Sequence, residues 1–510
     1  MTRKKASKRG IGTIVGTMFF IIIVIMVMTI LVSVFSSFSN YVQVFESYDQ
    51  QIQQNHETSF SISSLNFVTP PLTSSSPVTV GTSTNQQANA YSNENKLLYA
   101  QGLWWLFYSS GSAIVCRTSA NGLSWSAPVT VTTSATSSVG YTFSIWLSGT
   151  TIYYALSNNQ VSGSFLWRYG TLNSGGTISW SIPESSVSLP NPARANNYIS
   201  IVTDNSGNVW VALADNRGSV EVFSNLGGTW NRVNIVTGTV PILVPVTSGI
   251  VLIYGSGTTT TGTVYITTTV SGSSWTTSIS PPSQYALLYC SAFSVGNLVY
   301  FSGMASNSGG SGTGTVNFWS FTYGAGTTSA ETTIQSTAQA WYTSITQMSA
   351  STFLISYGAG SSMYFSYSRD QGSTWSSQQT ISTSEVSISG IVSSNTGGGI
   401  AWVSGSSSPY NVRFAYLSQP TLQIVASFQN SSPFAIHLVG LYLYDTNSST
   451  LVAHWDIESS APGVTGSFDE WVGAGQTQSV TFNFNWVQNN DYLVTVTTDQ
   501  GVISSSTFVS

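Results

Sequence analysis

Tryptophans that end short Ser- and Gly-rich turns recur along the middle of this 510-residue chain at intervals of about 50 residues. Between the turns lie short apolar runs without helical periodicity, such as NVWVALA at 208–214, which are typical of β-strands. A repeat of this length in an all-β segment predicts a β-propeller in which each unit forms one blade. The turn tryptophans are Trp125, Trp180, Trp230, Trp275 and Trp375, and the long last interval contains one unit without its tryptophan.

The strand runs assign residues 77–419 to the propeller and favour seven blades, with six as the alternative. The last unit, at 386–418, has only three strand runs. Its missing outer strand can come from Pro77-Val78-Thr79-Val80, which resembles Pro128-Val129-Thr130-Val131 after the first turn. A ring closed by strands from both ends of the segment has no open edge between the first and last blades.

The sequence pattern changes after Pro420, where the predicted strands are longer and alternate apolar and polar residues. This pattern predicts a separate immunoglobulin-like β-sandwich over 420–510. The segment also holds two N-x-S/T sequons, which make Asn430 and Asn447 candidate glycosylation sites. Residues 55–76, between the N-terminal part and the propeller, are expected to be a linker.

The N-terminal part begins with a basic segment, 1–10, which holds five of the chain's 13 Lys and Arg residues. An uncharged apolar run, Ile11 to Phe35, follows and is long enough to cross a bilayer as a helix. Apolar residues continue at helical spacing to about residue 54, so we expect one helix over 11–54. By the positive-inside rule the basic end is cytoplasmic, which predicts a single-pass anchor with the rest of the chain at the cell surface.

The junction Lys8-Arg9-Gly10-Ile11-Gly12-Thr13 resembles the class III signal peptide of archaeal type IV pilin-like proteins. The resemblance covers about the first 50 residues and implies cleavage between Gly10 and Ile11, with the apolar helix kept on the mature protein. It also implies other pilin-like subunits as partners and an extracellular filament as a second location. Val15 stands where bacterial pilins carry Glu, and the head is large for a major subunit, so an uncleaved membrane anchor is the alternative.

The turn Ser368-Arg369-Asp370-Gln371-Gly372-Ser373-Thr374-Trp375 resembles the Asp-box of sialidase-like propellers. Its structural residues are Ser368, Asp370, Gly372 and Trp375: the carboxylate can accept backbone hydrogen bonds and the glycine can adopt a positive φ. Weaker copies end at Trp125, Trp230 and Trp275, and in the first of them Ala120 stands at the Asp position. In that family the Asp-box lies on the face away from the active site, so it predicts fold rather than catalysis.

A sialidase site requires three arginines, a Tyr–Glu nucleophile pair and an acid/base Asp. The tentative catalytic residues are Arg194, Asp215, Arg217 and Tyr285, but only two arginines reach the expected face, where outer strands cross to inner strands. An exo-glycosidase of sialidase type is therefore an alternative function and not the leading one. The residues expected on this face are Tyr91, Glu94, Arg194, Asp215, Arg217, Tyr285, Trp341, Tyr342, Glu385 and Tyr410.

Charged residues make up only 6% of the chain, and the positive charges outside the first ten residues are scattered. Nucleic acid is therefore excluded as a partner, because phosphate binding needs clustered Lys and Arg. No cofactor motif is present, and His437 and His454 are not expected to bind a metal.

Aromatic rings beside hydroxyls and amides suit uncharged sugars, and Trp341, Tyr342 and Tyr410 are the tentative ligand-binding residues. The leading function is binding or adhesion at the cell surface, to a glycan or a neighbouring surface protein. A structural subunit or tip of a pilus-like filament is a further alternative, and enzymatic activity is left open.

Overall fold

The computed structural model describes residues 9–510 except 58, 135–141, 158–162, 191–195, 216–217, 257–261, 277–278, 286, 288–289, 307–313, 384, 386–387, 395–397, 419, 459–462 and 487–489. The chain forms two compact units. One consists of Met1–Pro71 together with Pro420–Ser510, and the other is Leu72–Gln419.

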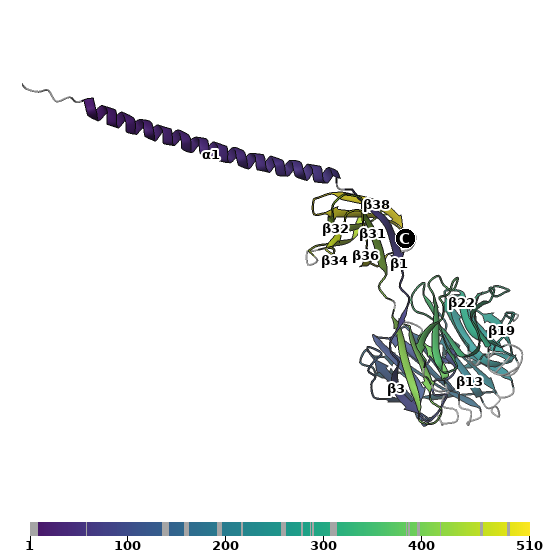
Figure 1. The fold of residues 1–510 in the computed structure, drawn as a ribbon. Helices are drawn as coiled ribbons and strands as arrows, with labels where there is room; N and C mark the ends of the chain where they lie inside the picture. Colours follow the sequence, from purple (N-terminus) through teal and green to yellow (C-terminus); the bar gives the residue numbers. More distant parts are fainter. Residues whose placement is uncertain are drawn as a thin grey trace, which may run out of the picture. The chain divides into compact units, whose positions relative to one another are not determined.

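The first unit begins with helix α1 (Arg9–Glu57), which Figure 1 shows as one uninterrupted helix. Within it, the segment Val15–Glu46 is long and apolar enough to cross a membrane. Its large side chains are exposed along the whole segment, as at Phe19 (65%) and Phe35 (70%). A helix that is apolar on every side and unburied by the protein's own core suits a membrane anchor or a signal sequence.

The sandwich contains a strand that the sequence analysis placed in a linker. Strand β1 (Phe60–Val68) pairs antiparallel with β31 (Gln423–Asn430), so the expectation of a linker over 55–76 is wrong for this part. The propeller sequence is therefore inserted between the first two strands of the sandwich. The sheets are β1, β31 and β36 (Thr477–Asn483) on one side, and β32 (Ile436–Asp445), β33 (Thr450–Asp456), β34 (Gly466–Ser467), β35 (Glu470–Val472), β37 (Asp491–Thr498) and β38 (Ile503–Val509) on the other.

The strands of the second unit form a propeller of seven blades within the described residues. In each blade, antiparallel strands run in sequence order from the axis outward, and the long strand β24 leaves the fifth blade and enters the sixth. Blade one is β4 (Leu97–Ala100), β5 (Leu103–Ser109), β6 (Ile114–Ser119) and β7 (Val129–Thr132); blade two is β8 (Phe143–Ser148), β9 (Thr151–Ser157) and β10 (Ser164–Leu172), edged by β11 (Ile178–Trp180) and β12 (Ser185–Ser188); and blade three is β13 (Asn196–Thr203), β14 (Val209–Asp215), β15 (Ser219–Ser224) and β16 (Asn231–Thr237). Blade four is β17 (Thr239–Val246), β18 (Gly249–Gly255) and β19 (Gly262–Thr269), with β20 (Gln284–Tyr285), and blade five is β21 (Ser291–Val295), β22 (Leu298–Ser306), β23 (Gly314–Thr322) and the start of β24 (Thr332–Gln347). Blade six is the end of β24 with β25 (Phe353–Ala359), β26 (Ser362–Ser368) and β27 (Gln379–Ser382), and blade seven is β28 (Ser389–Ser393), β29 (Gly399–Ser404) and β30 (Tyr410–Ser418).

The ring closes as the sequence predicts. Strand β3 (Val78–Ser83), from the start of the unit, supplies the outer strand of the seventh blade by pairing antiparallel with β30. Strand β2 (Thr73–Ser74) pairs with the end of the same strand. Both ends of the propeller segment are thus hydrogen-bonded into one blade, which removes the open edge that an unclosed ring would expose.

The turn tryptophans pack one blade against another. The ring of Trp375 lies 5.1 Å from Phe318 in the preceding blade, measured between centroids. The ring of Trp125 lies 4.9 Å from Phe414 in the seventh blade in the same way. Gly372 has φ +92°, and a Cβ there would lie 2.4 Å from the Phe318 ring, so the turn requires glycine for both conformation and space.

Hydrogen bonds inside the turns correct one detail of the sequence alignment. Asp370 accepts bonds from the backbone N–H of Thr374 (2.8 Å) and from its hydroxyl (2.6 Å). In the first turn the corresponding acceptor is Asn121, whose Oδ1 lies 2.9 Å from the backbone N of Ser124. Ala120 therefore does not occupy the acceptor position, because this turn forms its bonds one residue later.

Inner-strand serines join neighbouring blades. In each case a serine hydroxyl accepts a hydrogen bond from a backbone N–H on the inner strand of the next blade, which would otherwise lack a partner at the sheet edge. The Ser content of the chain therefore has a structural use at the propeller axis as well as in turns. The pairs are Ser144 with Ile201 (3.3 Å), Ser200 with Leu243 (3.1 Å), Ser291 with Ile345 (2.6 Å) and Ser344 with Ser393 (2.9 Å).

Candidate functional site

Residues 88–96, which we call the axial plug, fill the centre of the propeller. The plug contains the 3-10 helix η1 (Ser92–Glu94), which contacts the inner strands β8, β13, β21, β24 and β28. Only a segment on the propeller axis can reach the inner strands of so many blades. Apart from the half-buried Asn95, every residue of the plug is buried. Tyr91 and Glu94, expected on an open ligand-binding face, are therefore enclosed in the structure.

Polar side chains of the plug bind backbone groups of the inner strands. The Ser92 hydroxyl donates to the carbonyl oxygen of Ile391 at 2.6 Å, and the Asn93 amide donates to the carbonyl oxygen of Pro241 at 3.3 Å. These bonds satisfy carbonyl groups that face the axis and have no further strand beside them. The plug thus takes the place that water or a ligand would occupy in an open channel.

A buried ion pair lies inside the plug. The Lys96 ammonium is 2.6 Å from Glu94 Oε2, and neither side chain is exposed. The ammonium also donates to the Ala90 carbonyl oxygen and lies 4.5 Å from the centre of the Phe143 ring. Burial raises the pKa of Glu94 to about 8, an effect that Lys96 opposes only in part, and burial also lowers the pKa of Lys96. Because the pair is enclosed, we assign it to the structure of the plug.

A pocket opens at the opposite end of the axis from the face favoured by the sequence analysis. It encloses about 580 Å³, part of it open to solvent. The inner strands β17, β21 and β24 end at this pocket. The third strand of each blade runs parallel to the inner strand and ends on the same side, as β26 does before the turn that holds Trp375. The pocket therefore lies on the face of the turn tryptophans. The lining residues are Asn93 and Asn95 from the plug, Trp146, Leu243, Val244, Pro245, Ala292, Phe293, Ser294, Thr346 and Gln347.

A second depression adjoins this pocket and shares Trp146, Pro245 and Ser294 with it. It measures about 880 Å³ including open solvent, and it lies over the turns that follow the inner strands of blades two to five. We call the pocket and the depression together the axial hollow. Trp146 lies in both parts, and its indole N–H donates to the Thr203 hydroxyl at 2.9 Å, which fixes the orientation of the ring.

Hydrogen bonds between blades hold the rim of the axial hollow. The Asn205 amide donates to the carbonyl oxygen of Thr247 at 2.8 Å. Asn297 accepts a bond from the backbone N–H of Ser248 at 2.9 Å and donates to the Ser248 hydroxyl at 2.8 Å. Turns of three successive blades are therefore connected, which favours a preformed site.

The lining of the axial hollow, as the structure describes it, has one ionisable side chain, Asp204. Its carboxylate accepts bonds from the backbone N–H groups of Ser206 and Asn208, both at 2.9 Å, and from the indole N–H of Trp210 at 3.0 Å. These bonds close the turn between β13 and β14. The hollow thus offers amides, hydroxyls and an aromatic ring to a ligand, and its single carboxylate is engaged by the protein.

Of the tentative catalytic residues, Asp215 and Tyr285 do not line the axial hollow. Arg194 and Arg217 lie outside the described residues. Asp215 is buried at the end of β14, where its Oδ1 accepts a bond from the backbone N–H of Ser219 at 2.8 Å. That bond closes the hairpin to β15, so the structure gives Asp215 a local role in the fold.

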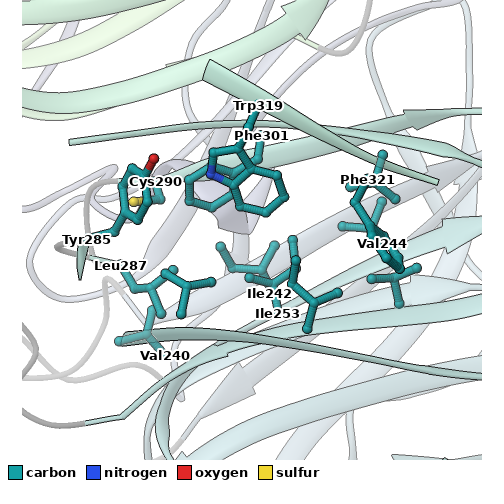
Figure 2. Close-up of a cluster of buried hydrophobic side chains, with 14 of the residues drawn as sticks. Val240, Ile242, Val244, Ile253, Tyr285, Leu287, Cys290, Phe301, Trp319 and Phe321 are labelled. Carbon is teal, nitrogen blue, oxygen red and sulfur yellow. The ribbon is translucent and has the colours of Figure 1, made fainter. Parts of the chain in front are cut away.

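Tyr285 packs in the hydrophobic core between blades four and five, beside Leu287 and Cys290 (Figure 2). Burial and the neighbouring Glu331 carboxylate raise the pKa of Tyr285 far above its ordinary value. A tyrosine nucleophile needs the opposite shift, because its phenolate must form. Glu331 is itself engaged by Ser283, whose hydroxyl and backbone N–H lie 2.5 and 3.1 Å from its oxygens. The Tyr–Glu proximity here is structural.

The tentative ligand-binding residues also differ from expectation. Tyr342 is buried in the core between blades six and seven, with φ +52°, and does not face a ligand. Tyr410 is half-buried and packs on the core between blades seven and one. The side chain of Trp341 lies outside the described residues. Glu385, also expected on this face, is buried and lies 3.4 Å from an Arg413 guanidinium nitrogen.

Sequence reasoning missed Trp146, the tryptophan in the described lining of the axial hollow. The available signal was its position, because it follows Trp125 by only 21 residues and so departs from the 50-residue interval of the turn tryptophans. It lies within an inner strand, β8, instead of ending a turn. The amides of Asn93, Asn95 and Asn205 carried no such signal, since Asn is common in loops.

The two sequons have different environments. The Asn430 side chain is buried, and its amide nitrogen donates to the carbonyl oxygens of Phe434 (2.8 Å) and Val472 (2.9 Å). That nitrogen is the atom a glycan would occupy, so the structure contradicts Asn430 as a glycosylation site. Asn447 is exposed in the turn between β32 and β33 and stays a candidate.

Comparisons with known proteins give a fold likeness only. No family model matches the chain, and no curated protein matches it. Among solved structures, the Hadza microbial sialidase is similar at 15% identity with a TM-score of 0.37, over 54% of this chain and 64% of that one, so this chain spans slightly under two thirds of it. Trypanosoma rangeli sialidase is similar at 11% identity and TM-score 0.39, over 86% and 89% of the two chains. An oligogalacturonate lyase from Vibrio parahaemolyticus is similar at 7% identity and TM-score 0.41, over 69% and 98%.

Proposed function

We propose that this protein is a membrane-anchored surface protein whose propeller binds an uncharged glycan in the axial hollow. The observation that carries the proposal is the composition of the hollow: the fixed ring of Trp146 beside the amides of Asn93, Asn95 and Gln347 and several hydroxyls. A sugar ring offers an apolar face for an aromatic side chain and hydroxyl groups for amides. Neither contact requires charge on the protein.

Helix α1 supports the anchor. Its apolar segment is exposed on all sides, and the basic residues that precede it fit a cytoplasmic end. The bulk of the chain would then lie outside the cell, where surface glycans are available as ligands. Asn447 is the candidate glycosylation site that remains in this arrangement.

The described lining of the hollow favours binding over hydrolysis. Glycoside hydrolysis ordinarily uses two carboxyl groups, one on each side of the scissile bond. The described lining has one, Asp204, and four protein donors already bind it. A sialidase would also need several arginines for the sugar carboxylate, and the described lining contains none.

Replacing Trp146 with Ala is expected to weaken glycan binding at least tenfold, because the variant loses the indole ring that lines both parts of the hollow. The measurement is calorimetric titration of the full chain in nanodiscs with glycans that bind on an array. Trp180→Ala is the matched control, since Trp180 lies on the outer edge of the same blade, under the Arg168 guanidinium. Equal affinities for the wild type and Trp146→Ala would contradict the proposal.

A filament subunit is a second candidate function, and one observation favours it. Only residues 58 and 59 separate the end of α1 from the first sandwich strand, so the apolar helix continues almost directly into a β-sandwich head. If the protein is processed and polymerises, the mature N-terminus will be Ile11 and sheared filaments will contain the chain. Edman or mass-spectrometric identification of Met1 on the protein in the membrane would support the plain anchor instead.

A further inference from the structure

A second aromatic surface lies on the sandwich, at Trp471. Of the tryptophan side chains that the structure describes, Trp471 alone is exposed, with 62% of its surface accessible. It lies on β35, which pairs with the first residues of β32. Leaving a large apolar ring in solvent forgoes the burial that stabilises the other tryptophans, which suggests that the surface serves another use.

The ring of Trp471 has a fixed orientation because His437 lies flat beneath it. The two ring planes differ by 2° and their centroids are 4.3 Å apart. His437 is in turn held at both ring nitrogens: Nε2 is 2.6 Å from Asp469 Oδ1, and Nδ1 is 3.3 Å from Asp499 Oδ2. Three side chains thus hold one face of the indole and leave the other free.

The charge of this group follows from its contacts. Hydrogen bonding to Asp469, and to a lesser extent to Asp499, raises the pKa of His437, so the imidazolium is favoured and donates to both carboxylates. Asp469 and Asp499 come from separate loops, so their approach to His437 depends on the fold of the sandwich. With the imidazolium formed, the three groups carry a net charge of about −1.

A hollow of about 680 Å³, including open solvent, lies beside the platform. Its wall includes the apolar Phe434 and Ile436 together with Trp471, and its polar groups are His437, Thr498, Asp499 and Gln500. An exposed aromatic platform next to hydroxyl, carboxylate and amide groups forms a site with one apolar wall and one hydrogen-bonding edge.

We propose that this sandwich hollow is a second carbohydrate site, which binds one uncharged pyranose ring on the free face of Trp471. The sugar's C–H face would stack on the indole, and its hydroxyls would meet polar groups at the edge of the hollow, such as Gln500. The net negative charge disfavours uronic and sialic acids. A cationic ligand is disfavoured as well, because the His437 imidazolium already lies under the ring and already binds both carboxylates.

The sandwich offers a matched control for this stack. Tyr442 lies on His454 with ring centroids 4.2 Å apart and planes 17° apart, and His454 Nε2 is 3.1 Å from Asp456 Oδ2. The chemistry is similar, but these residues do not line the sandwich hollow. A change at Tyr442 therefore tests whether an aromatic–histidine stack matters apart from the hollow.

The test uses full-length protein in nanodiscs on an array of neutral, amino and acidic glycans, followed by titration with the neutral glycans that bind. In the Trp146→Ala background, which removes the platform of the axial hollow, neutral glycans should still bind. Adding Trp471→Ala should reduce that affinity at least tenfold, Trp471→Phe should retain most of it, and Tyr442→Ala should leave it unchanged. Loss of binding in Trp146→Ala alone would leave the axial hollow as the one glycan site and overturn this proposal.

His437 acts here as a positioning residue, and pH provides its test. Above the raised pKa of His437 the neutral ring donates through one nitrogen only, so one aspartate contact is lost and the platform loosens. Affinity at the sandwich hollow should therefore fall as pH rises through that pKa, and the His437→Ala variant should lose the pH dependence. Binding that survives Trp471→Ala, or that prefers acidic or amino sugars, would overturn the proposal.

Discussion

Replacing Lys96 with Met should lower the free energy of unfolding of the propeller by about 3–5 kcal/mol at pH 7, the largest effect expected of any single substitution discussed here. The variant leaves Glu94 fully buried without the ammonium that lies 2.6 Å from it. The Glu94 carboxyl group must then stay protonated inside the axial plug, or the plug must unfold so that water can solvate the carboxylate. Urea unfolding monitored by tryptophan fluorescence and circular dichroism measures the loss.

The pH dependence of this variant has a definite sign. Without Lys96, the folded pKa of Glu94 rises above the value of about 8 that burial and the lysine together set, while the unfolded value stays near 4.5. A group whose pKa is higher in the folded state contributes its full stabilisation below the unfolded pKa. That contribution is lost as the pH rises toward the folded pKa. Between pH 5 and 8 the stability of Lys96→Met should therefore fall by about 1.4 kcal/mol per pH unit.

The wild type should have a shallower slope, because the lowered pKa of Lys96 has the opposite effect on proton uptake to the raised pKa of Glu94. The double variant Glu94→Gln, Lys96→Met is the control, since it removes both charges and keeps similar side-chain volumes. It should be more stable than Lys96→Met at pH 7 and independent of pH over the same range. Equal, pH-independent stability of the single and double variants would show that the pair is not a buried ion pair.

The burial of the axial plug could not be predicted from the sequence. Residues 83–96, STNQQANAYSNENK, read as a polar loop, and nothing in their spacing predicts burial. A buried Glu and Lys are unusual enough that exposure is the reasonable expectation for both. Their burial depends on backbone groups from inner strands of several blades, which become neighbours only when the ring closes.

The blades themselves were predictable because their information is local. Five of the turns carry their own glycine and their own tryptophan, and the strands are short apolar runs, so a repeat of about 50 residues was visible along the chain. Closure by β3 was predictable for the same reason, since Pro77-Val78-Thr79-Val80 resembles Pro128-Val129-Thr130-Val131 in the first blade. Contacts within one blade span few residues, whereas the axial hollow draws its lining from five blades and the plug.

Strand β1 shows why the pairing of two strands far apart in the sequence is difficult to predict. Its residues alternate between buried and exposed at the start, but their partner, β31, begins 355 residues further along the chain. With the propeller inserted between the two strands, no local pattern distinguishes an isolated strand from an extended linker. The error in the sequence analysis follows from this insertion.

The insertion leads to a prediction about the sandwich alone. A fragment comprising residues 420–510 should fail to fold, because it lacks β1 and the apolar side chains of Phe60, Ile62 and Leu65 that lie in the sandwich core. Burial of three such side chains contributes about 5–9 kcal/mol, which is comparable to the whole stability of a small domain. Circular dichroism and one-dimensional NMR of the fragment should show an unfolded chain.

Restoring β1 should restore the fold without the propeller. Val68 pairs with Gln423 at the end of the β1–β31 ladder, so residues 69–422 can be replaced by a short Gly/Asn turn that joins the two strands as a hairpin. The shortened chain, 60–68 joined to 423–510, should give dispersed NMR signals and one cooperative thermal transition. A folded 420–510 fragment with the same transition temperature would contradict the role of β1, because the sandwich core would then be complete without the strand that precedes the propeller.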